Sequence, residues 1–186
     1  MRITGGAFRN RRVETQGAPR LRPSSDKTRA RLFSMLRTRL AVFPPARVLD
    51  VFAGSGALGL EALSRGAAQC TFIEQAPAAC RLVRSNLERL GAAERGIVLR
   101  RNALRLARPP SGLGPFDLAL LDPPYGREDW RHALMQLAQF GWLAPQAWCV
   151  VEIARTPAAP LPLEGFAHEA QRDDGRVRLV FYRRGG

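Results

Sequence analysis

The chain has 186 residues, enough for one domain with a sizeable core, and its 46% hydrophobic and 24% charged residues are typical of a globular protein. The net charge of +13 is unusual, because 29 basic residues stand against 16 acidic ones. The three cysteines, Cys70, Cys80 and Cys149, are odd in number and lack any CxxC spacing. This argues against a disulfide framework and a zinc site and fits a reducing cytoplasm.

The positive charge is concentrated near the N-terminus. Residues 1–47 hold 12 arginines and lysines against two acidic residues, a net charge of +10, whereas residues 48–186 carry a net charge of +3. This distribution suits a polyanion such as nucleic acid, and a merely solvated surface is the alternative.

The first elements in chain order lie within this basic region. Residues 1–24 are rich in Gly, Pro and Arg and predict short strands or an extended arm. Ser24 or Ser25 is then expected to cap a helix with Asp26 in its first turn. Four apolar residues share one face of that helix: Leu32, Phe33, Leu36 and Leu40.

From Arg47 onward, strand and helix patterns alternate. Strands are predicted at 47–52, 69–74, 97–100, 116–121 and 147–153, and helices at 57–66, 77–91 and 129–140. Residues 132–151 carry no charge and could nominally span a membrane, but three glutamines, Gly141 and Pro145 interrupt them, so a helix, a loop and a strand are favoured. The tail predicts a hairpin of 166–173 and 176–184 around Asp174-Gly175.

This alternation predicts a doubly wound, Rossmann-like α/β sheet, mostly parallel, with a C-terminal antiparallel hairpin. Pro44-Pro45 marks the expected boundary between a small basic N-terminal extension at residues 1–45 and an α/β domain at residues 46–186.

A glycine-rich turn joins the first strand of the α/β domain to its helix. Gly54, Gly56 and Gly59 complete a GxGxxG pattern, in which glycines let the backbone turn tightly and approach a ligand. Glu74 ends the next strand 20 residues after Gly54, where a carboxylate can accept hydrogen bonds from ribose hydroxyls. Together these features favour a nucleoside-containing cofactor, although GxGxxG alone is a weak signal.

Asp50 lies four positions before Gly54, inside the sequence LDVFAGSG. A carboxylate there is awkward beside a pyrophosphate and useful beside a cationic ligand. The arrangement resembles motif I of class I S-adenosylmethionine (SAM) methyltransferases, in which this region lies against the methionine end of SAM. Asp50 could equally hold the loop by hydrogen bonds, and the two roles are compatible.

The sequence DPPYG at 122–126 follows an apolar strand. It resembles the (D/N)PP(Y/F) signature of methyltransferases that act on planar nitrogen. The Asp122 carboxylate and the Pro123 carbonyl would accept N–H bonds from an amine whose lone pair is delocalised, and Tyr125 could stack on the ring. A plain strand-ending turn is the alternative.

The resemblance extends over nearly the whole chain. RITGGAFRNRRV, LRPSSDKTRARLFSML, LDVFAGSGALGLEALSRGA, FDLALLDPPY and GWLAPQAWCVVE follow one another as in the RsmD family. Those bacterial enzymes methylate the 2-amino group of a guanine, at position 966, in 16S ribosomal RNA. The resemblance therefore implies a cytoplasmic methyltransferase that uses SAM, needs no metal, and acts on 16S RNA within an assembling 30S particle, with no membrane and no obligate protein partner.

The resemblance also implies roles for particular residues. SAM is expected to contact Asp50, Phe52, Gly54, Ser55, Gly56, Glu74, Asn102 and Ala103. Catalysis is expected at Asp122, Pro123 and Tyr125, and RNA contacts at Arg9, Arg11, Arg12, Arg22 and Arg29. Many SAM enzymes have Asp where this chain has Asn102, whose amide oxygen can still accept from the adenine amino group.

Rival functions differ in the acceptor or in the class of protein. Adenine N6 in nucleic acid and a glutamine amide in a protein use related tetrapeptides. An NAD(P)-dependent oxidoreductase would lack a substrate domain and leave DPPY unexplained. A non-catalytic RNA-binding module would not need Asp122 beside an intact glycine loop.

Overall fold

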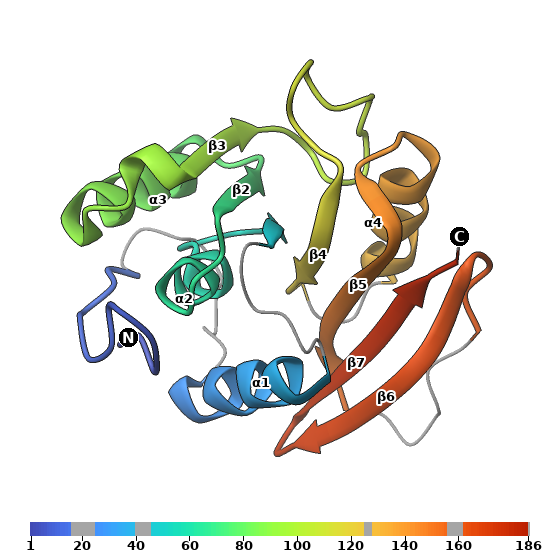
Figure 1. Ribbon diagram of the computed structural model, residues 1–186, viewed down its shortest axis with the longest axis horizontal. Coiled ribbons are helices and arrows are strands. Elements are labelled where there is room, and N and C mark those ends of the chain that lie inside the picture. The colour runs from blue at the N-terminus through green and yellow to red at the C-terminus, as the bar shows by residue number, and fades with distance from the viewer. Residues whose placement is uncertain (16–24, 40–45, 125–127, 156–161, 186) are drawn as a thin grey trace.

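The computed structural model describes residues 1–15, 25–39, 46–124, 128–155 and 162–185. Within them, seven strands form one sheet in the order β3-β2-β1-β4-β5-β7-β6 (Figure 1). The strands are β1 (Arg47–Val51), β2 (Gln69–Glu74), β3 (Gly96–Arg100), β4 (Phe116–Leu121), β5 (Leu143–Ala154), β6 (Phe166–Asp174) and β7 (Val177–Arg184). The helices are α1 (Asp26–Arg39), α2 (Ala57–Ser64), α3 (Pro77–Leu90), the 3₁₀ turn η1 (Ala93–Arg95) and α4 (Asp129–Gln139).

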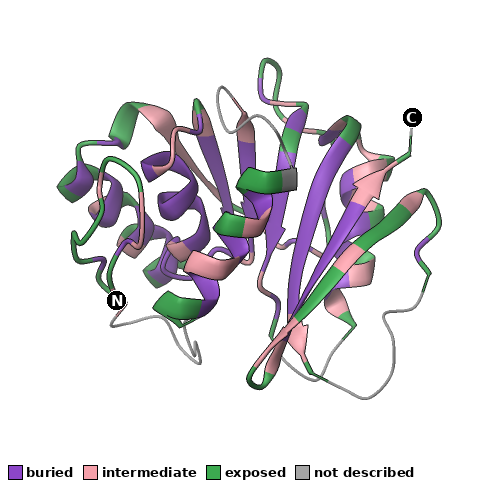
Figure 2. Ribbon diagram, turned by 60° about the horizontal axis from the view of Figure 1, so that its bottom comes forward, coloured by how far each residue is buried: buried purple, intermediate pink, exposed green. Residues whose placement is uncertain are grey.

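The strand directions confirm the predicted architecture. β1 through β5 pair in parallel, whereas β7 pairs antiparallel with both β5 and β6. β5 begins at Leu143, four residues before the predicted start at Ala147, because Leu143 pairs with Phe116 across an irregularity in the ladder. Figure 2 shows β6 as a largely exposed strand at one edge of the sheet.

Alternate residues of the central strands enter two separate cores. Val48 of β1 packs in the core beneath α1, α2 and α3, whereas Leu49 packs in the core beneath α4. Residues 101–115 connect β3 to β4 without a helix, and they place Ala103, Leu106 and Leu113 in the α4 core. The sheet is therefore covered on both faces, as expected for a doubly wound fold.

The N-terminal segment, residues 1–15, packs on the α/β domain. Ile3 and Val13 are 1% and 3% exposed and belong to the same core as Val48. Arg2 and Arg12 form an isolated antiparallel bridge, which is the only pairing of the predicted short strands within the described residues. The segment also bonds the end of α2, where the Ser64 carbonyl accepts the N–H of Ala7 at 2.7 Å.

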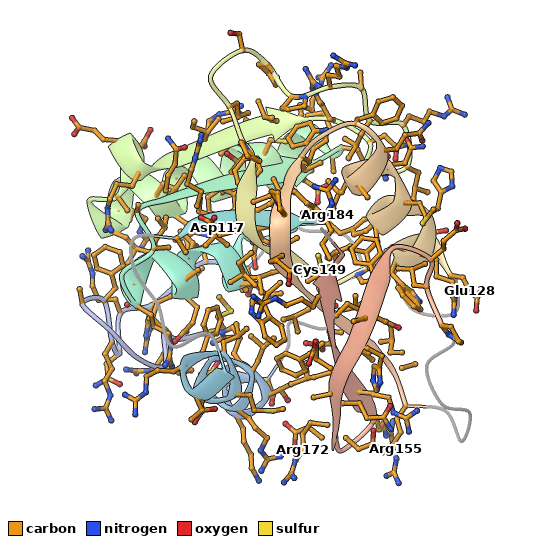
Figure 3. All side chains as sticks on the ribbon, turned by 45° about the vertical axis from the view of Figure 1, so that its right-hand side comes forward. Asp117, Glu128, Cys149, Arg155, Arg172 and Arg184 are labelled. Atoms are coloured by element: carbon orange, nitrogen blue, oxygen red, sulfur yellow. The ribbon has the colours of Figure 1, made fainter. Side chains whose placement is uncertain are left out.

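Helix α1 begins as predicted. The Ser25 hydroxyl accepts the N–H of Thr28 at 3.0 Å, and Asp26 lies in the first turn. Leu32, Phe33 and Leu36 are buried in the core, while Leu40 lies outside the described residues. At its outer side, Arg31 pairs with Asp174 in the β6–β7 hairpin. Figure 3 shows Arg155 and Arg172 at this end of the hairpin.

Candidate functional site

The glycine loop follows β1 at the carboxyl edge of the sheet. Phe52, Gly54 and Gly56 have φ angles of 62°, 54° and 79°, so the chain winds through left-handed conformations before α2 begins. Phe52 is the unusual member, because a bulky residue rarely adopts such a φ angle. A strained backbone conformation is maintained where many surrounding contacts hold it in place, and such conformations are common at ligand sites.

Gly59 allows α2 to lie close to β2. A Cβ atom at Gly59 would stand 2.3 Å from Cε1 of Phe72 and 2.6 Å from Sγ of Cys70, and both of these side chains are fully buried. The third glycine of the pattern is therefore required by helix–strand packing, while Gly54 and Gly56 serve the turn itself.

Asp50 is buried at the base of the loop with 1% of its surface exposed. Its Oδ2 accepts the N–H of Gly59 at 2.8 Å, so the predicted loop-holding hydrogen bond is present. Burial raises the pKa of the Asp50 carboxyl to about 8, against the lowering effect of the Gly59 bond, and the negative charge of Glu74 adds to the rise.

Glu74 ends β2 and faces the same loop. Its Oε2 accepts the N–H of Gly54 at 2.9 Å, and its Oε1 accepts the N–H of Ala76 at 2.8 Å. Each carboxylate oxygen can accept a further hydrogen bond, so the two backbone donors orient the group without exhausting it. Sequence spacing alone did not reveal that Glu74 and the loop contact each other directly.

Asn102 and Ala103 follow β3, the strand that lies beside β2 at the edge of the sheet. Asn102 Oδ1 accepts the N–H of Leu104 at 2.9 Å, which closes a short turn, and an amide oxygen can accept a second bond. The Arg101 N–H donates to the Glu74 carbonyl at 3.0 Å, and this contact brings the turn beside Glu74. Ala103 is 5% exposed.

Asp122 and Pro123 follow β4, the neighbour of β1. Val51 pairs with Leu121, and the Asp122 N–H donates to the Val51 carbonyl at 3.5 Å, so the two strand ends lie side by side. After β1 the chain turns toward β2, and after β4 it turns toward β5, which makes this junction the switch point where α/β proteins bind ligands. Tyr125 lies outside the described residues.

Arg29 corrects one of the predictions for RNA contact. Its side chain is 0% exposed and donates to Asp26 at 2.8 Å and to the Arg2 carbonyl. Its Nε lies 3.5 Å from Oε2 of Glu61, which is also fully buried. The guanidinium is thus buried and not exposed for contact with a phosphate, and its partners show that it holds α1, α2 and the N-terminal segment together.

Glu61, for which no role was predicted from the sequence, is the centre of that buried network. Thr4 donates both its backbone N–H, at 2.9 Å, and its hydroxyl, at 2.6 Å, to the Glu61 carboxylate. Arg65 Nε donates to the same group at 2.8 Å. Because helical spacing places Glu61 on α2 without revealing what faces it, the sequence could not predict these partners.

The other arginines predicted to contact RNA differ in availability. Arg9 and Arg12 are exposed. Arg11 donates to the carbonyls of Arg89 and Leu90 at the end of α3, so part of its guanidinium is engaged. Arg22 lies outside the described residues.

Among the described residues, no three or more His, Cys, Asp and Glu residues gather as ligands for a metal ion. The described helices include none with the length and apolar character needed to cross a membrane.

Comparison with known proteins gives consistent similarities over the full chain. A family described as "Conserved hypothetical protein 95" matches residues 1–183. Ribosomal RNA small subunit methyltransferase D of Escherichia coli strain K12 is 35% identical over 184 residues, which cover 99% of this chain and 90% of that protein. The protein of the same name from Haemophilus influenzae is 33% identical over 153 residues, 82% of this chain and 78% of that protein.

A solved structure agrees with these similarities. A putative methyltransferase from Escherichia coli superposes with a TM-score of 0.82 at 34% identity, covering 100% of this chain and 98% of that one. The similarity thus includes the N-terminal segment as well as the α/β sheet.

Proposed function

The chain belongs to the family described as conserved hypothetical protein 95, and from this premise we propose that it transfers a methyl group from SAM to the 2-amino group of a guanine in 16S ribosomal RNA, at position 966. The similarity confirms the resemblance to the RsmD family, whose relatives are named as small-subunit ribosomal RNA methyltransferases. The observation that carries the proposal is the placement of Asp122-Pro123 beside the glycine loop at the switch point of the sheet.

The residues around the glycine loop fit SAM chemically. Glu74 is held by two backbone donors and keeps acceptor capacity for the two ribose hydroxyls. The pKa of Asp50 is raised because the carboxyl is buried, and no positive charge among the described residues offsets this rise; the cationic methionine end of SAM would do so. Asn102 and Ala103 lie beside Glu74, where the adenine would extend from the ribose.

Asp122, Pro123 and Tyr125 would position the acceptor. When bound, SAM supplies an electrophilic methyl group on a sulfonium. The Asp122 carboxylate and the Pro123 carbonyl would accept the N–H bonds of the guanine amine and direct its remaining electron density at that methyl. Tyr125 would stack on the flipped base and fix its plane. Positioning would supply most of the catalysis, and no strong base is needed because the methylated nitrogen loses its proton readily.

The basic N-terminal region would hold the phosphate backbone, with Arg9 and Arg12 exposed for that role. A paired guanine hides its 2-amino group, so the target would lie in an unpaired segment. The chain offers little surface for reading a sequence, and we therefore expect the shaped RNA–protein surface of an assembling 30S particle to be a better substrate than naked 16S RNA. With such a substrate the protein would act in the cytoplasm.

The test supplies methyl-labelled SAM with each substrate in turn: 30S particles lacking the modification, naked 16S RNA, DNA and protein. The product is then digested and analysed. Label in N2-methylguanosine is expected; label in methyladenine or methylglutamine would replace the proposal with the corresponding alternative.

A matched pair of variants connects this activity to the site. Asp122→Ala should nearly abolish turnover and leave the dissociation constant for SAM close to that of the wild type. Asp117→Asn alters a carboxylate at the opposite end of the same strand, where it accepts the Arg47 N–H at 2.8 Å, and should retain turnover. If the turnover of Asp122→Ala stays within a few-fold of the wild type, Asp122 does not position the acceptor amine.

A further inference from the structure

Asn86 makes three hydrogen bonds from a fully enclosed position on α3. Only 1% of the surface of Asn86 is exposed. Nδ2 donates to the Glu14 carbonyl at 3.0 Å and to the Ser55 carbonyl at 3.2 Å, while Oδ1 accepts the Glu14 N–H at 3.0 Å. Both amide hydrogens are therefore used, and they join two backbone segments that are far apart in the sequence.

Asp50 and Asn86 satisfy two backbone groups on either side of the start of α2. The helix begins at Ala57, so the N–H of Gly59 lies in its first turn, has no partner within the helix and donates to Asp50 Oδ2 at 2.8 Å. Ser55 precedes the helix and is 4% exposed, so its carbonyl cannot rely on bulk water, and Asn86 donates to it. Asp50 and Asn86 thus each fix one part of the turn that leads into α2.

The bonds to Glu14 fix the N-terminal segment at the same point. They engage the Glu14 backbone on both its N–H and its carbonyl, one residue after the buried Val13. The described part of the N-terminal segment consequently ends beside Asn86, which also bonds the loop that would hold SAM, whereas its middle, at Ala7, contacts the C-terminal end of α2.

We propose that Asn86 is a positioning residue that holds the glycine loop in its SAM-binding shape and couples that shape to the placement of the basic N-terminal segment. The inference rests on the proposed function, because it concerns the SAM site and the region expected to bind RNA. Coupling of this kind acts in both directions. SAM binding should reduce the motion of the N-terminal segment at Glu14, and loss of the Asn86 hydrogen bonds should weaken SAM binding.

Asn86→Asp is the most specific variant. It preserves the shape of the side chain, removes both donors, and places a carboxylate oxygen against the Ser55 and Glu14 carbonyls. The dissociation constant for SAM, measured by calorimetry without RNA, should rise about tenfold or more. At saturating SAM, kcat should stay within about threefold of the wild type, because Asp122 and Pro123 lie on β4 and not on the loop.

Two controls separate positioning from general loss of stability. Glu14→Ala removes a side chain that pairs with Arg89 at the surface and leaves the backbone bonds to Asn86 intact, so SAM affinity should not change. Val180→Ala truncates a fully buried side chain in β7, on the other side of β5 from β4, and should lower the melting temperature without weakening SAM binding.

Hydrogen exchange tests the coupling in the wild type without any substitution. Adding SAM should slow exchange of the Glu14 amide, which donates to Asn86, and the effect should be lost in Asn86→Asp. Unchanged SAM affinity in Asn86→Asp, an equal loss in Val180→Ala, or Glu14 exchange that ignores SAM would overturn the inference and leave the proposed function standing. Failure of the wild type to bind SAM would overturn both.

Discussion

At the scale of single residues, the ionisation of Asp50 connects the site to stability. Its pKa rises from 3.8 to about 8 on folding, chiefly because burial removes the carboxylate from water. Between these two values the unfolded chain has released the proton and the folded protein still holds it. The contribution of Asp50 is therefore fully present below pH 4 and is lost as the pH rises toward 8.

This sign predicts that the difference in unfolding free energy between the wild type and Asp50→Asn changes with pH. The wild type should lose stability relative to the variant as the pH rises from about 4 to about 8, with a limiting slope of about 1.4 kcal/mol per pH unit for one proton. Urea unfolding of both proteins without SAM would measure it. Parallel curves across this range would mean that Asp50 is ionised in the folded protein.

The sequence predicted residues whose role follows from a position along a strand or a turn. Asp50, Glu74 and Asp122 each stand at the carboxyl end of a parallel strand, and parallel strands align those ends. It did not predict Asn86, whose partner Glu14 lies 72 residues away, or the burial of Arg29. Such contacts depend on which faces of α1, α2 and α3 meet, and helical periodicity does not specify that.

At the scale of elements, the packing of α2 on β2 depends on Gly59. Gly59→Ala would place a Cβ atom 2.3 Å from Phe72, which is fully buried and cannot move aside, so α2 must shift outward. Overpacking of this kind costs about 1–3 kcal/mol, and the shift also displaces the N–H that Asp50 accepts. We therefore expect lower stability in urea together with weaker SAM binding.

Gly91→Ala is the matched control for that prediction. Gly91 ends α3 with a φ angle of 68° and has open space around its Cβ position, so alanine there meets backbone strain of about 1–2 kcal/mol and no clash. It should lose stability and keep its SAM affinity. If Gly59→Ala behaves in the same way as this control, close packing of α2 is not what the loop requires.

The positions of the elements were predictable because most have strong local signals. Helix α3 matches the prediction at 77–91, because Pro77 suits the first turn of a helix and Gly91 follows its end. The early start of β5 was not predictable, since Pro145 and Gln146 read as a loop and only pairing with β4 extends the strand across them. The packing of residues 101–115 was also hidden, because Pro109-Pro110 and Gly112 interrupt the helical spacing of Ala103, Leu106 and Leu113, which enter the α4 core from a connection without a helix.

At the scale of the whole molecule, the basic N-terminal region is both a charged surface and part of the core. This region is attached to the α/β domain by the buried side chains of Ile3 and Val13 and by the hydrogen bonds of Thr4. Arg29 belongs to the same attachment, because its buried guanidinium pairs with Glu61. The division at residue 45 stays a prediction about domains, yet a truncation of the first residues would remove core side chains as well as charge. Point substitutions at exposed arginines are therefore the sharper test of RNA binding.

The double variant Arg9→Ala/Arg12→Ala removes two exposed charges from the N-terminal segment. If both arginines contact phosphates, fewer counterions are released on binding, and the slope of log affinity against log salt should become shallower by about 1.4, or roughly 0.7 for each contact to unpaired RNA. The Michaelis constant for RNA at fixed salt should rise, whereas SAM affinity should not change.

Arg172→Ala/Arg176→Ala supplies a control with the same change in net charge. Both residues are exposed near the turn of the β6–β7 hairpin, whose Asp174 pairs with Arg31 of α1, and neither belongs to the N-terminal segment. Long-range attraction between the protein and RNA falls equally in the two double variants, so only direct phosphate contact can make their salt slopes differ. Binding of the assembling 30S particle, measured from 50 to 300 mM salt (about 14 to 6 Å of Debye length), should separate them. Equal slopes would move the RNA contact away from Arg9 and Arg12.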